Sequence, residues 1–277
     1  NIDKLHAPRR LALNYELLTS VMRRLALEAG DAVMEIYKSS DFDVNVKSDN
    51  SPVTAADEVA DHLISVGLRA AFPDVALITE EQIVSHSQRA DKYLIVDPLD
   101  GTKEFIHRRG DFTVNIAYIE NGIPTRGIVY APAKGRLFYT LADGGSVEEL
   151  GNFGLAEGAK KVPIQVNIAN NDGLRVVASK SHRDPETDAY IEKYAVTDMK
   201  SAGSSLKFCL IAAGEADLYP RLGRTMEWDT AAGHAVLSGA GGAVVRFDDL
   251  QPLRYGKPAY ENSFFIAHGQ GVILKEP

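Results

Sequence analysis

The sequence contains little of two features that narrow the class of a protein, cysteine and long apolar runs. Cys209 is the single cysteine among 277 residues, so no internal disulfide can form, which favours a reducing compartment. Its helical spacing with Leu206, Leu210 and Ala213 indicates a core residue rather than a nucleophile. Every apolar stretch is far shorter than the roughly 20 residues of a membrane-spanning helix, and no signal-peptide pattern opens the chain. We therefore expect a cytoplasmic protein without a transmembrane segment.

An excess of basic residues is also missing. The chain has 38 acidic and 30 basic residues and a formal net charge of −8, which argues against nonspecific binding of a nucleic acid polymer. A small nucleotide is not excluded, because metal ions can neutralise an acidic site and make it attractive to phosphate. The length allows a substantial core, in two packed subdomains or in one large α/β unit.

The apolar spacing predicts a layered α/β fold whose first half is rich in antiparallel hairpins. A long amphipathic helix is indicated by the 3.6-residue repeat of Leu18, Val21, Met22, Leu25, Ala29, Ala32, Val33 and Ile36. A second helix is expected after Thr54. Strands are expected at residues 76–79, 93–96, 113–119, 125–130 and 136–140. Turn signals such as Asn121-Gly122 separate the later strands, which predicts an antiparallel meander.

Residues 144–161 form the best candidate boundary, because they are rich in glycine and charge and have no clear period. Beyond them, strands and helices alternate. Strands are expected at 174–178, 216–219 and 242–247, and helices at 185–194, at 204–213 and after Asp229. We expect two subdomains, residues 11–150 and 160–277, without internal repeats.

The most informative motif is the run Asp97-Pro98-Leu99-Asp100-Gly101-Thr102 at the end of an apolar strand. Pro98 restricts Asp97 to extended conformations, so the strand is expected to stop there and both carboxylates to face one point. Gly101 permits a close approach of the backbone to a ligand, and Thr102 opens a helical turn. Carboxylate and carbonyl oxygens suit Mg²⁺ beside a substrate phosphate. The alternative is that Asp-Pro and Asp-Gly are ordinary turn dipeptides.

Other acids occur at the ends of predicted elements. Glu80 and Glu81 follow the strand at 76–79, and Asp229 lies where a helix begins. Asp57 lies in a polar segment that leads into the second helix. Each could be a cap or a surface charge, but open α/β layers place ligands at such termini.

These residues belong to five segments that carry a specific family resemblance. In chain order they are residues 49–57, 79–81, 96–105, 203–208 and 228–234. The chain resembles the inositol monophosphatase superfamily of metal-dependent, lithium-sensitive phosphatases, and most closely its bacterial 3′(2′),5′-bisphosphate nucleotidases. The similarity runs from about Leu18 to near the C-terminus, whereas residues 1–10 match nothing. It implies a layered αβαβα sandwich, with most metal ligands in the first subdomain.

The resemblance implies two Mg²⁺ ions and allows a third, weaker one beside Asp57. Two metals can activate a water at neutral pH and stabilise the leaving alkoxide. The implied ligands are Glu80, Asp97 and the Leu99 carbonyl for one ion and Asp97, Asp100 and Asp229 for the other. Glu80 and Thr102 would orient the attacking water, with Asp57 supporting Thr102. Li⁺ and Ca²⁺ are expected to inhibit.

A nucleotide bisphosphate also needs cationic or hydroxyl donors and a flat apolar wall. Lys207 is expected to hold the nonreacting 5′-phosphate; the alternative is a surface lysine after an ordinary N-cap serine. His182 and Arg221 resemble family positions near the nucleotide, with a solvated loop histidine and an unrelated surface charge as alternatives. The expected substrate contacts are Glu80, Leu99, Asp100, Gly101, Thr102, His182, Gly203, Ser204, Ser205, Lys207, Arg221 and Asp229.

Three functions follow from these observations. The first is hydrolysis of adenosine 3′,5′-bisphosphate to AMP and phosphate, with the sulfated nucleotide of sulfur assimilation as a further substrate. The second is an inositol or sugar monophosphatase, and the third is a noncatalytic nucleotide or cation sensor. The protein is expected to be a monomer or a homodimer, and the resemblance allows peripheral attachment to the cytoplasmic face of the inner membrane. Glu227 has no predicted role.

Overall fold

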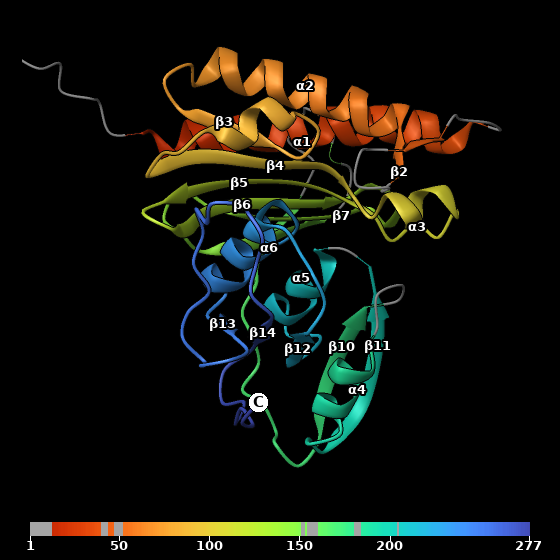
Figure 1. Ribbon diagram of the computed structural model, residues 1–277, viewed down its shortest axis with the longest axis vertical. Helices are drawn as coiled ribbons and strands as arrows, with labels where there is room; N and C mark the ends of the chain where they lie inside the picture. Colours follow the sequence, from red (N-terminus) through yellow and green to blue (C-terminus); the bar gives the residue numbers. More distant parts are fainter. Residues whose placement is uncertain are drawn as a thin grey trace, which may run out of the picture.

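Two long helices, α1 (Tyr15–Lys38) and α2 (Ala55–Ala71), form one outer layer of the molecule (Figure 1). The structure is a computed structural model that describes residues 13–39, 44–46, 52–150, 153, 160–179, 184–203 and 205–277. Helix α1 begins where the Asn14 side chain accepts a hydrogen bond from the Leu17 N–H, at 3.0 Å. Both helices were predicted from the sequence and are confirmed.

The inner face of this layer covers a seven-stranded sheet with the order β3-β4-β5-β6-β7-β8-β9. Its strands are β3 (Ala76–Thr79), β4 (Lys92–Asp100), β5 (Thr113–Glu120), β6 (Ile123–Ala131), β7 (Arg136–Thr140), β8 (Ser146–Leu150) and β9 (Lys160–Pro163). Strands β3 and β4 are parallel, and the other neighbouring pairs are antiparallel. The predicted strands and meander are confirmed.

Strands β8 and β9 were not predicted, because they lie largely within residues 144–161, which have no clear period, and because β8 buries a charged residue. In β8 the charged Glu149 is buried and Leu150 is exposed. Glu149 accepts hydrogen bonds from Arg23 and Tyr139, so its burial is compensated. Strand β9 pairs with β8 and lies in the first sheet, within the range that begins the predicted second subdomain. The division at residues 11–150 and 160–277 stays a prediction.

A second, five-stranded sheet has the order β11-β10-β12-β14-β13. Its strands are β10 (Leu174–Ser179), β11 (Val196–Ala202), β12 (Leu218–Arg221), β13 (Ala243–Arg246) and β14 (Phe265–His268). Helices α5 (Leu206–Ala212) and α6 (Glu227–Gly239) lie between the two sheets, and α4 (Pro185–Ile191) packs on the far face of the second (Figure 1). This is the αβαβα sandwich that the resemblance implied. Strand β11 was missed because it is a largely exposed edge strand without apolar alternation.

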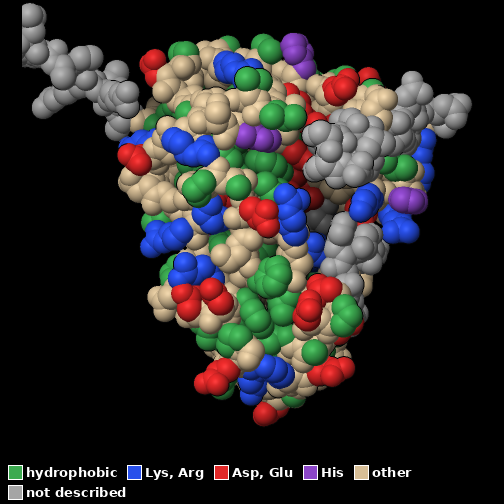
Figure 2. Space-filling view, in the orientation of Figure 1, with side chains coloured by type: hydrophobic (Ala, Val, Ile, Leu, Met, Phe, Trp, Pro, Cys, Tyr) green, Lys and Arg blue, Asp and Glu red, His purple; other side chains and the backbone are tan. Residues whose placement is uncertain are grey.

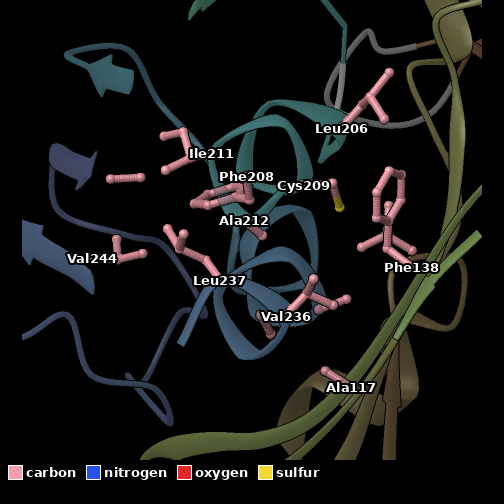
Figure 3. Packing of buried hydrophobic residues seen from close by; sticks show 14 of the residues in the cluster. Ala117, Phe138, Leu206, Phe208, Cys209, Ile211, Ala212, Val236, Leu237 and Val244 are labelled. Carbon is pink, nitrogen blue, oxygen red and sulfur yellow. The ribbon is translucent and has the colours of Figure 1, made fainter. Parts of the chain in front are cut away.

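The central core joins α5 and α6 to the first sheet. Val236 and Cys209 point toward Phe138 of the first sheet, whereas Phe208 lies on the opposite side and packs against Tyr219 and Phe265 of the second sheet (Figure 3). Cys209 is fully buried in the same cluster, and this burial raises the pKa of its thiol above the usual value. The prediction of a core cysteine is confirmed.

Short elements complete the fold near the end of β4. They are β1 (Val44–Val46), β2 (Pro52–Thr54), the 3₁₀ helices η1 (Ile83–Ser87) and η2 (Pro132–Lys134), and α3 (Thr102–Ile106). The predicted helical turn after Gly101 is therefore present. None of the helices in the described ranges combines the length and apolar character needed to cross a membrane.

Candidate metal centre

The two carboxylates at the end of β4 face one side of the sheet because the strand contains a bulge. Asp97 lies opposite Asn115 of β5, and Asp100 lies opposite Thr113. Three steps along β4 thus match two steps along β5, so β4 holds one extra residue. In a regular strand, residues three apart point to opposite faces. The strand continues to Asp100, so the prediction that it ends at Asp97 is wrong, although the expected convergence is correct.

Asp229 enters the same space from the first turn of α6. Its Oδ2 accepts a hydrogen bond from the Met226 N–H at 2.7 Å, which caps the helix. Carboxylate oxygens of Asp97, Asp100 and Asp229 all lie within 4.8 Å of one another. The cap alone therefore does not account for Asp229, and the sheet and the central helix layer both contribute to the cluster.

Glu80 adds a fourth carboxylate from the end of β3. Its N–H donates to the Val96 carbonyl at 3.1 Å, which continues the pairing of β3 with β4 by one residue. Its side chain lies close enough to Asp97 to raise the pKa of that carboxyl group. Carboxylates this close repel one another unless a proton or a cation lies between them. Four acids in one place thus need protons or a cation.

The protonation of this cluster fits a site for divalent cations. Burial raises the pKa of Asp97 and Asp229 well above the usual range, and repulsion from neighbouring carboxylates raises it further. Burial also raises the pKa of Asp100 to about 6, while Lys207 and the Ser205 N–H act against this rise. A divalent cation would supply the missing positive charge, and Mg²⁺ prefers hard oxygen ligands of this kind. The residues present therefore fit Mg²⁺.

Thr102 and Asp57 form a hydrogen-bonded pair beside these acids. The Thr102 hydroxyl lies 3.0 Å from Asp57 Oδ1 and 3.3 Å from the Leu99 carbonyl. Asp57 Oδ2 accepts two hydrogen bonds from Thr54, at 2.8 Å from N and 2.7 Å from Oγ1, and thereby caps α2. Gly101 precedes Thr102 with a φ of 95°, a left-handed conformation that favours glycine. The expected contact of Asp57 with Thr102 is present.

Ser205 and Asn115 connect Asp100 to α5. The Ser205 N–H donates to Asp100 Oδ2 at 2.8 Å, and its hydroxyl lies 2.7 Å from the Asp229 carbonyl. Asn115 donates to Ser205 Oγ at 2.9 Å and lies 3.3 Å from Asp100 Oδ2. Sequence reasoning missed Asn115, because only the bulged register reveals that it lies beside these acids. The Ser205 side chain makes no capping bond to α5, so the alternative of an ordinary N-cap serine is wrong.

Lys207 is buried next to the acidic cluster, with 4% of its surface exposed. Its Nζ lies 3.3 Å from the Ala202 carbonyl and 5.2 Å from the centre of the Tyr219 ring. Burial lowers the pKa of Lys207 to about 8, opposed chiefly by Asp100. The alternative of a surface lysine is therefore wrong. Figure 2 shows acidic side chains recessed in a hollow of the surface, with basic side chains at its border.

The remaining predicted contacts are placed as follows. Arg221 is buried at the end of β12, and its charge acts on Lys207 and Asp229, so it is not an unrelated surface charge. At Gly203 an added Cβ would lie 2.4 Å from the Asp111 carbonyl oxygen, so this position requires glycine. His182 and Ser204 lie outside the described residues.

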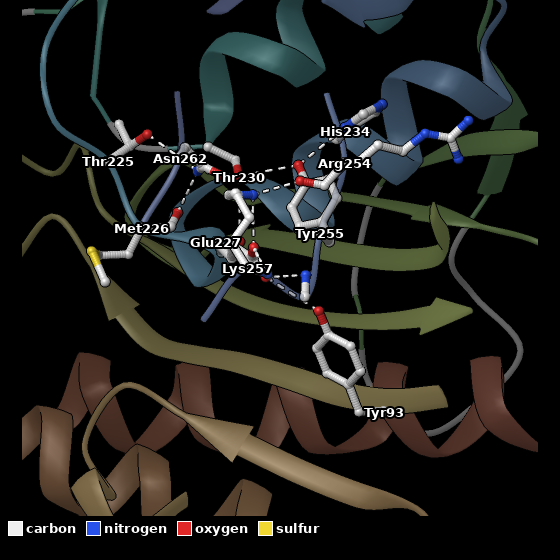
Figure 4. Close-up of polar contacts among 11 residues, drawn as sticks. Tyr93, Thr225, Met226, Glu227, Thr230, His234, Arg254, Tyr255, Lys257 and Asn262 are labelled. Carbon is white, nitrogen blue, oxygen red and sulfur yellow. Dashed lines mark hydrogen bonds and ion pairs between the residues drawn. The ribbon is translucent and has the colours of Figure 1, made fainter. Parts of the chain in front are cut away.

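Glu227 has a structural role that the sequence did not predict. It is fully buried at the start of α6 and accepts hydrogen bonds from the Gly256 and Lys257 N–H groups, at 2.8 and 2.9 Å. Its carboxylate also pairs with Lys257 Nζ at 2.7 Å and lies 3.2 Å from the Tyr93 hydroxyl (Figure 4). Glu227 therefore holds the 256–257 loop against the helix that carries Asp229.

This fold and acidic centre define a class of metal-dependent phosphatases, and comparison with known proteins agrees. The model of the inositol monophosphatase family matches residues 14–273, so the chain belongs to that family. The family prediction is confirmed. An IMPase from Thermotoga maritima has a TM-score of 0.70 at 27% identity, with 91% of this chain and 92% of that chain covered.

More specific similarity points to one group of enzymes. The 3′(2′),5′-bisphosphate nucleotidase CysQ of Escherichia coli K12 is 48% identical over 238 residues, covering 84% of this chain and 91% of that protein. The CysQ of Haemophilus influenzae is 32% identical over 253 residues, with 89% and 90% covered. The crystal structure of CysQ from Bacteroides thetaiotaomicron, at 37% identity, has a TM-score of 0.81 and covers 93% of this chain and 99% of that chain.

Proposed function

We propose that this protein is a Mg²⁺-dependent phosphatase that hydrolyses adenosine 3′,5′-bisphosphate to AMP and phosphate. The family membership and the nucleotidases to which the chain is similar support the reaction class. The observation that carries the substrate choice is the buried Lys207 beside Asp100. Its ammonium group provides a second anion site next to the candidate metal ligands, which a substrate with one phosphate would leave unused.

The candidate ligands are the side chains of Glu80, Asp97, Asp100 and Asp229 together with the Leu99 carbonyl. Mg²⁺ bound there supplies Lewis acidity and lowers the pKa of a bound water, which makes a nucleophile available at neutral pH. Asp97 contacts Glu80 and lies within the triad of aspartates, so it is placed to serve both ions. The N–H groups of Gly101 and Thr102 are candidates for phosphate contacts where α3 begins.

Thr102 and Asp57 are the candidate water-orienting pair. Because the Thr102 hydroxyl donates its hydrogen to Asp57, its lone pairs remain to accept a hydrogen bond from the attacking water. The direction of donation is fixed because an ionised carboxylate only accepts, and two bonds from Thr54 hold the Asp57 side chain in place. Glu80 is the candidate acceptor of the water's other proton. A cation or nucleotide sensor has no use for such a pair, which favours an enzyme.

The decisive experiment is phosphate release from a substrate panel at saturating Mg²⁺. The panel contains adenosine 3′,5′-bisphosphate, its sulfated counterpart, adenosine 3′-monophosphate, inositol 1-phosphate and fructose 1,6-bisphosphate. We expect the highest catalytic efficiency with the nucleotide bisphosphates. Higher efficiency with inositol 1-phosphate would contradict the nucleotidase assignment and favour the sugar phosphatase. No release from any of them would favour a sensor.

Several finer properties belong to the same proposal. We infer two Mg²⁺ ions per site with a third, weaker one beside Asp57, and inhibition by Li⁺ and Ca²⁺. Li⁺ fits hard oxygen ligands but carries half the charge of Mg²⁺, so it would stabilise a leaving alkoxide less well. Inhibition is checked by titrating each cation against fixed Mg²⁺. The protein is proposed to be a monomer or homodimer in the cytoplasm, with peripheral attachment to the inner membrane tested by vesicle sedimentation.

A further inference from the structure

Two of the candidate metal ligands lie on segments that are far apart in the sequence. Glu80 follows β3, whereas Asp229 lies in the first turn of α6. Mg²⁺ demands near-ideal octahedral geometry with oxygens at about 2.0–2.1 Å, so the separation of these two carboxylates must be closely fixed. One side chain, His86 in η1, contacts the residue directly before each of them.

The first contact of His86 holds the peptide group that leads into Glu80. Its Nε2 lies 2.7 Å from the Thr79 carbonyl oxygen. A carbonyl only accepts, so Nε2 carries the hydrogen and donates it. The N–H of the same peptide group belongs to Glu80 and donates to the Val96 carbonyl at 3.1 Å. Both ends of this peptide are therefore held, one by β4 and the other by His86, whose contact is shorter than the 3.3 Å contacts of the Ser85 hydroxyl and the Gln82 N–H with the same carbonyl.

The second contact joins His86 to α6. Its ring stacks on the ring of Trp228, with centroids 4.8 Å apart and an interplanar angle of 26°. Trp228 directly precedes Asp229 and is itself 7% exposed. Tyr260 lies beside both rings, at 6.3 Å from His86 and 6.2 Å from Trp228, and donates its hydroxyl to the Gln88 carbonyl at 2.6 Å. Tyr260 therefore packs beside both stacked rings and helps to hold them together.

We propose that His86 is a positioning residue of the metal centre, which sets the separation of Glu80 and Asp229 through its N–H and the face of its ring. This inference rests on the proposed metal centre. His86 is not among the side chains that converge in the acidic cluster, and its Nε2 is bonded to Thr79. It acts through Thr79 and Trp228, so its loss weakens cation binding and leaves the groups that bind the nucleotide unchanged.

Direct binding of Mn²⁺ tests this proposal without an activity measurement. Mn²⁺ takes the same carboxylate and carbonyl oxygens as Mg²⁺ and is followed by electron paramagnetic resonance. We expect His86→Ala, which loses both contacts, to raise the Mn²⁺ dissociation constant roughly threefold to tenfold. His86→Phe keeps the ring and loses the donor, so its dissociation constant is expected to lie between those of His86→Ala and the parent. If His86→Ala does not fold, the Mn²⁺ affinity of His86→Phe still tests the proposal.

Gln88→Ala is the matched control. Gln88 donates to the Leu77 carbonyl at 3.1 Å and so ties the same segment to β3, but its side chain contacts neither Thr79 nor Trp228. This variant is expected to bind Mn²⁺ as the parent does, even if its Tm falls. In steady-state assays, His86→Ala should need more Mg²⁺ for half-maximal rate, with unchanged KM for nucleotide and near-normal kcat at saturating Mg²⁺.

Two results would overturn the assignment to His86. They are unchanged Mn²⁺ affinity in His86→Ala and His86→Phe, or an equal loss of affinity in Gln88→Ala. Failure of the proposed function is recognised separately, from the parent protein. If the parent protein binds Mn²⁺ but releases no phosphate, the proposed reaction is contradicted and the positioning role of His86 can still be tested. If the parent protein binds no Mn²⁺, both proposals are contradicted.

Discussion

The N–H of Ser205 donates a 2.8 Å hydrogen bond to the Asp100 carboxylate, so the segment that carries the buried Lys207 is tied directly to a candidate metal ligand. The Ser205 hydroxyl also lies 2.7 Å from the Asp229 carbonyl. We therefore expect binding of a cation and binding of a second phosphate to be coupled through this short segment.

Asp97→Asn is expected to abolish nearly all turnover. Asp97 lies in the centre of the acidic cluster and is buried with 1% exposure, so the neutral amide removes charge where two ions need it. Phosphate release at saturating Mg²⁺ checks this. The control is Asp74→Asn, which replaces an exposed aspartate and is expected to keep normal activity. Near-normal turnover by Asp97→Asn would be incompatible with the assigned two-metal centre.

Lys207→Ala is expected to lose about tenfold to hundredfold in kcat/KM with adenosine 3′,5′-bisphosphate, the value of one charge-assisted contact. The loss should largely disappear with adenosine 3′-monophosphate, which has no second phosphate to hold. Lys193→Ala is the control, since that lysine is exposed and contacts the Glu276 carbonyl and the Tyr190 ring rather than the acidic cluster. Equal losses on both substrates would show that Lys207 supports the fold or the metal site instead.

Stabilisation of the protein by Mg²⁺ is expected to grow as the pH rises through about 6, the pKa of Asp100. In the metal-free folded state the pKa of Asp100 is about 6, and those of Asp97 and Asp229 are also raised. The folded state thus holds more protons than the unfolded chain, so these groups contribute less stability as pH rises through their folded pKa values. Mg²⁺ competes with the same protons.

The measurement is the Tm of the protein with Mg²⁺ minus its Tm with a chelator, taken at each pH. Titratable groups outside the site contribute equally to both Tm values, so their effect is absent from the difference. Asp100→Asn removes one of the competing protons and should flatten the dependence. An increment that is constant or falls with pH would argue against cation binding at these carboxylates.

Glu227→Gln is expected to lower the free energy of unfolding by about 2–4 kcal/mol, because it removes the negative charge that pairs with Lys257 and weakens two backbone hydrogen bonds in a buried place. Denaturant unfolding checks this. Glu261→Gln breaks an exposed pair with Arg224 and should change stability by less than about 1 kcal/mol. Equal effects of the two substitutions would contradict the anchoring role of Glu227.

Much of the fold could be predicted because local rules and burial agree there. Residues 15–38 repeat apolar side chains at helical spacing, and they form α1 with that face buried. The meander from β5 to β7 follows the apolar runs and turn residues of the sequence. Prediction failed at β8, where a buried Glu149 and an exposed Leu150 reverse the usual pattern. The partners of Glu149 lie 10 and 126 residues away, so no local rule could reveal them.

The sequence by itself determined the chemistry of this protein: its acids at element ends, the restriction that Pro98 imposes on Asp97, the turn at Gly101 and the cap that Thr54 offers to α2. These depend on a residue and its near neighbours. Only the tertiary structure decided how they combine. A bulge register turns Asp97 and Asp100 to one face, burial converts Lys207 from a surface charge into a candidate anion site, and packing of η1 on α6 brings His86 to Trp228. Such features depend on contacts between residues that are distant along the chain, and those contacts exist only once the layers have packed.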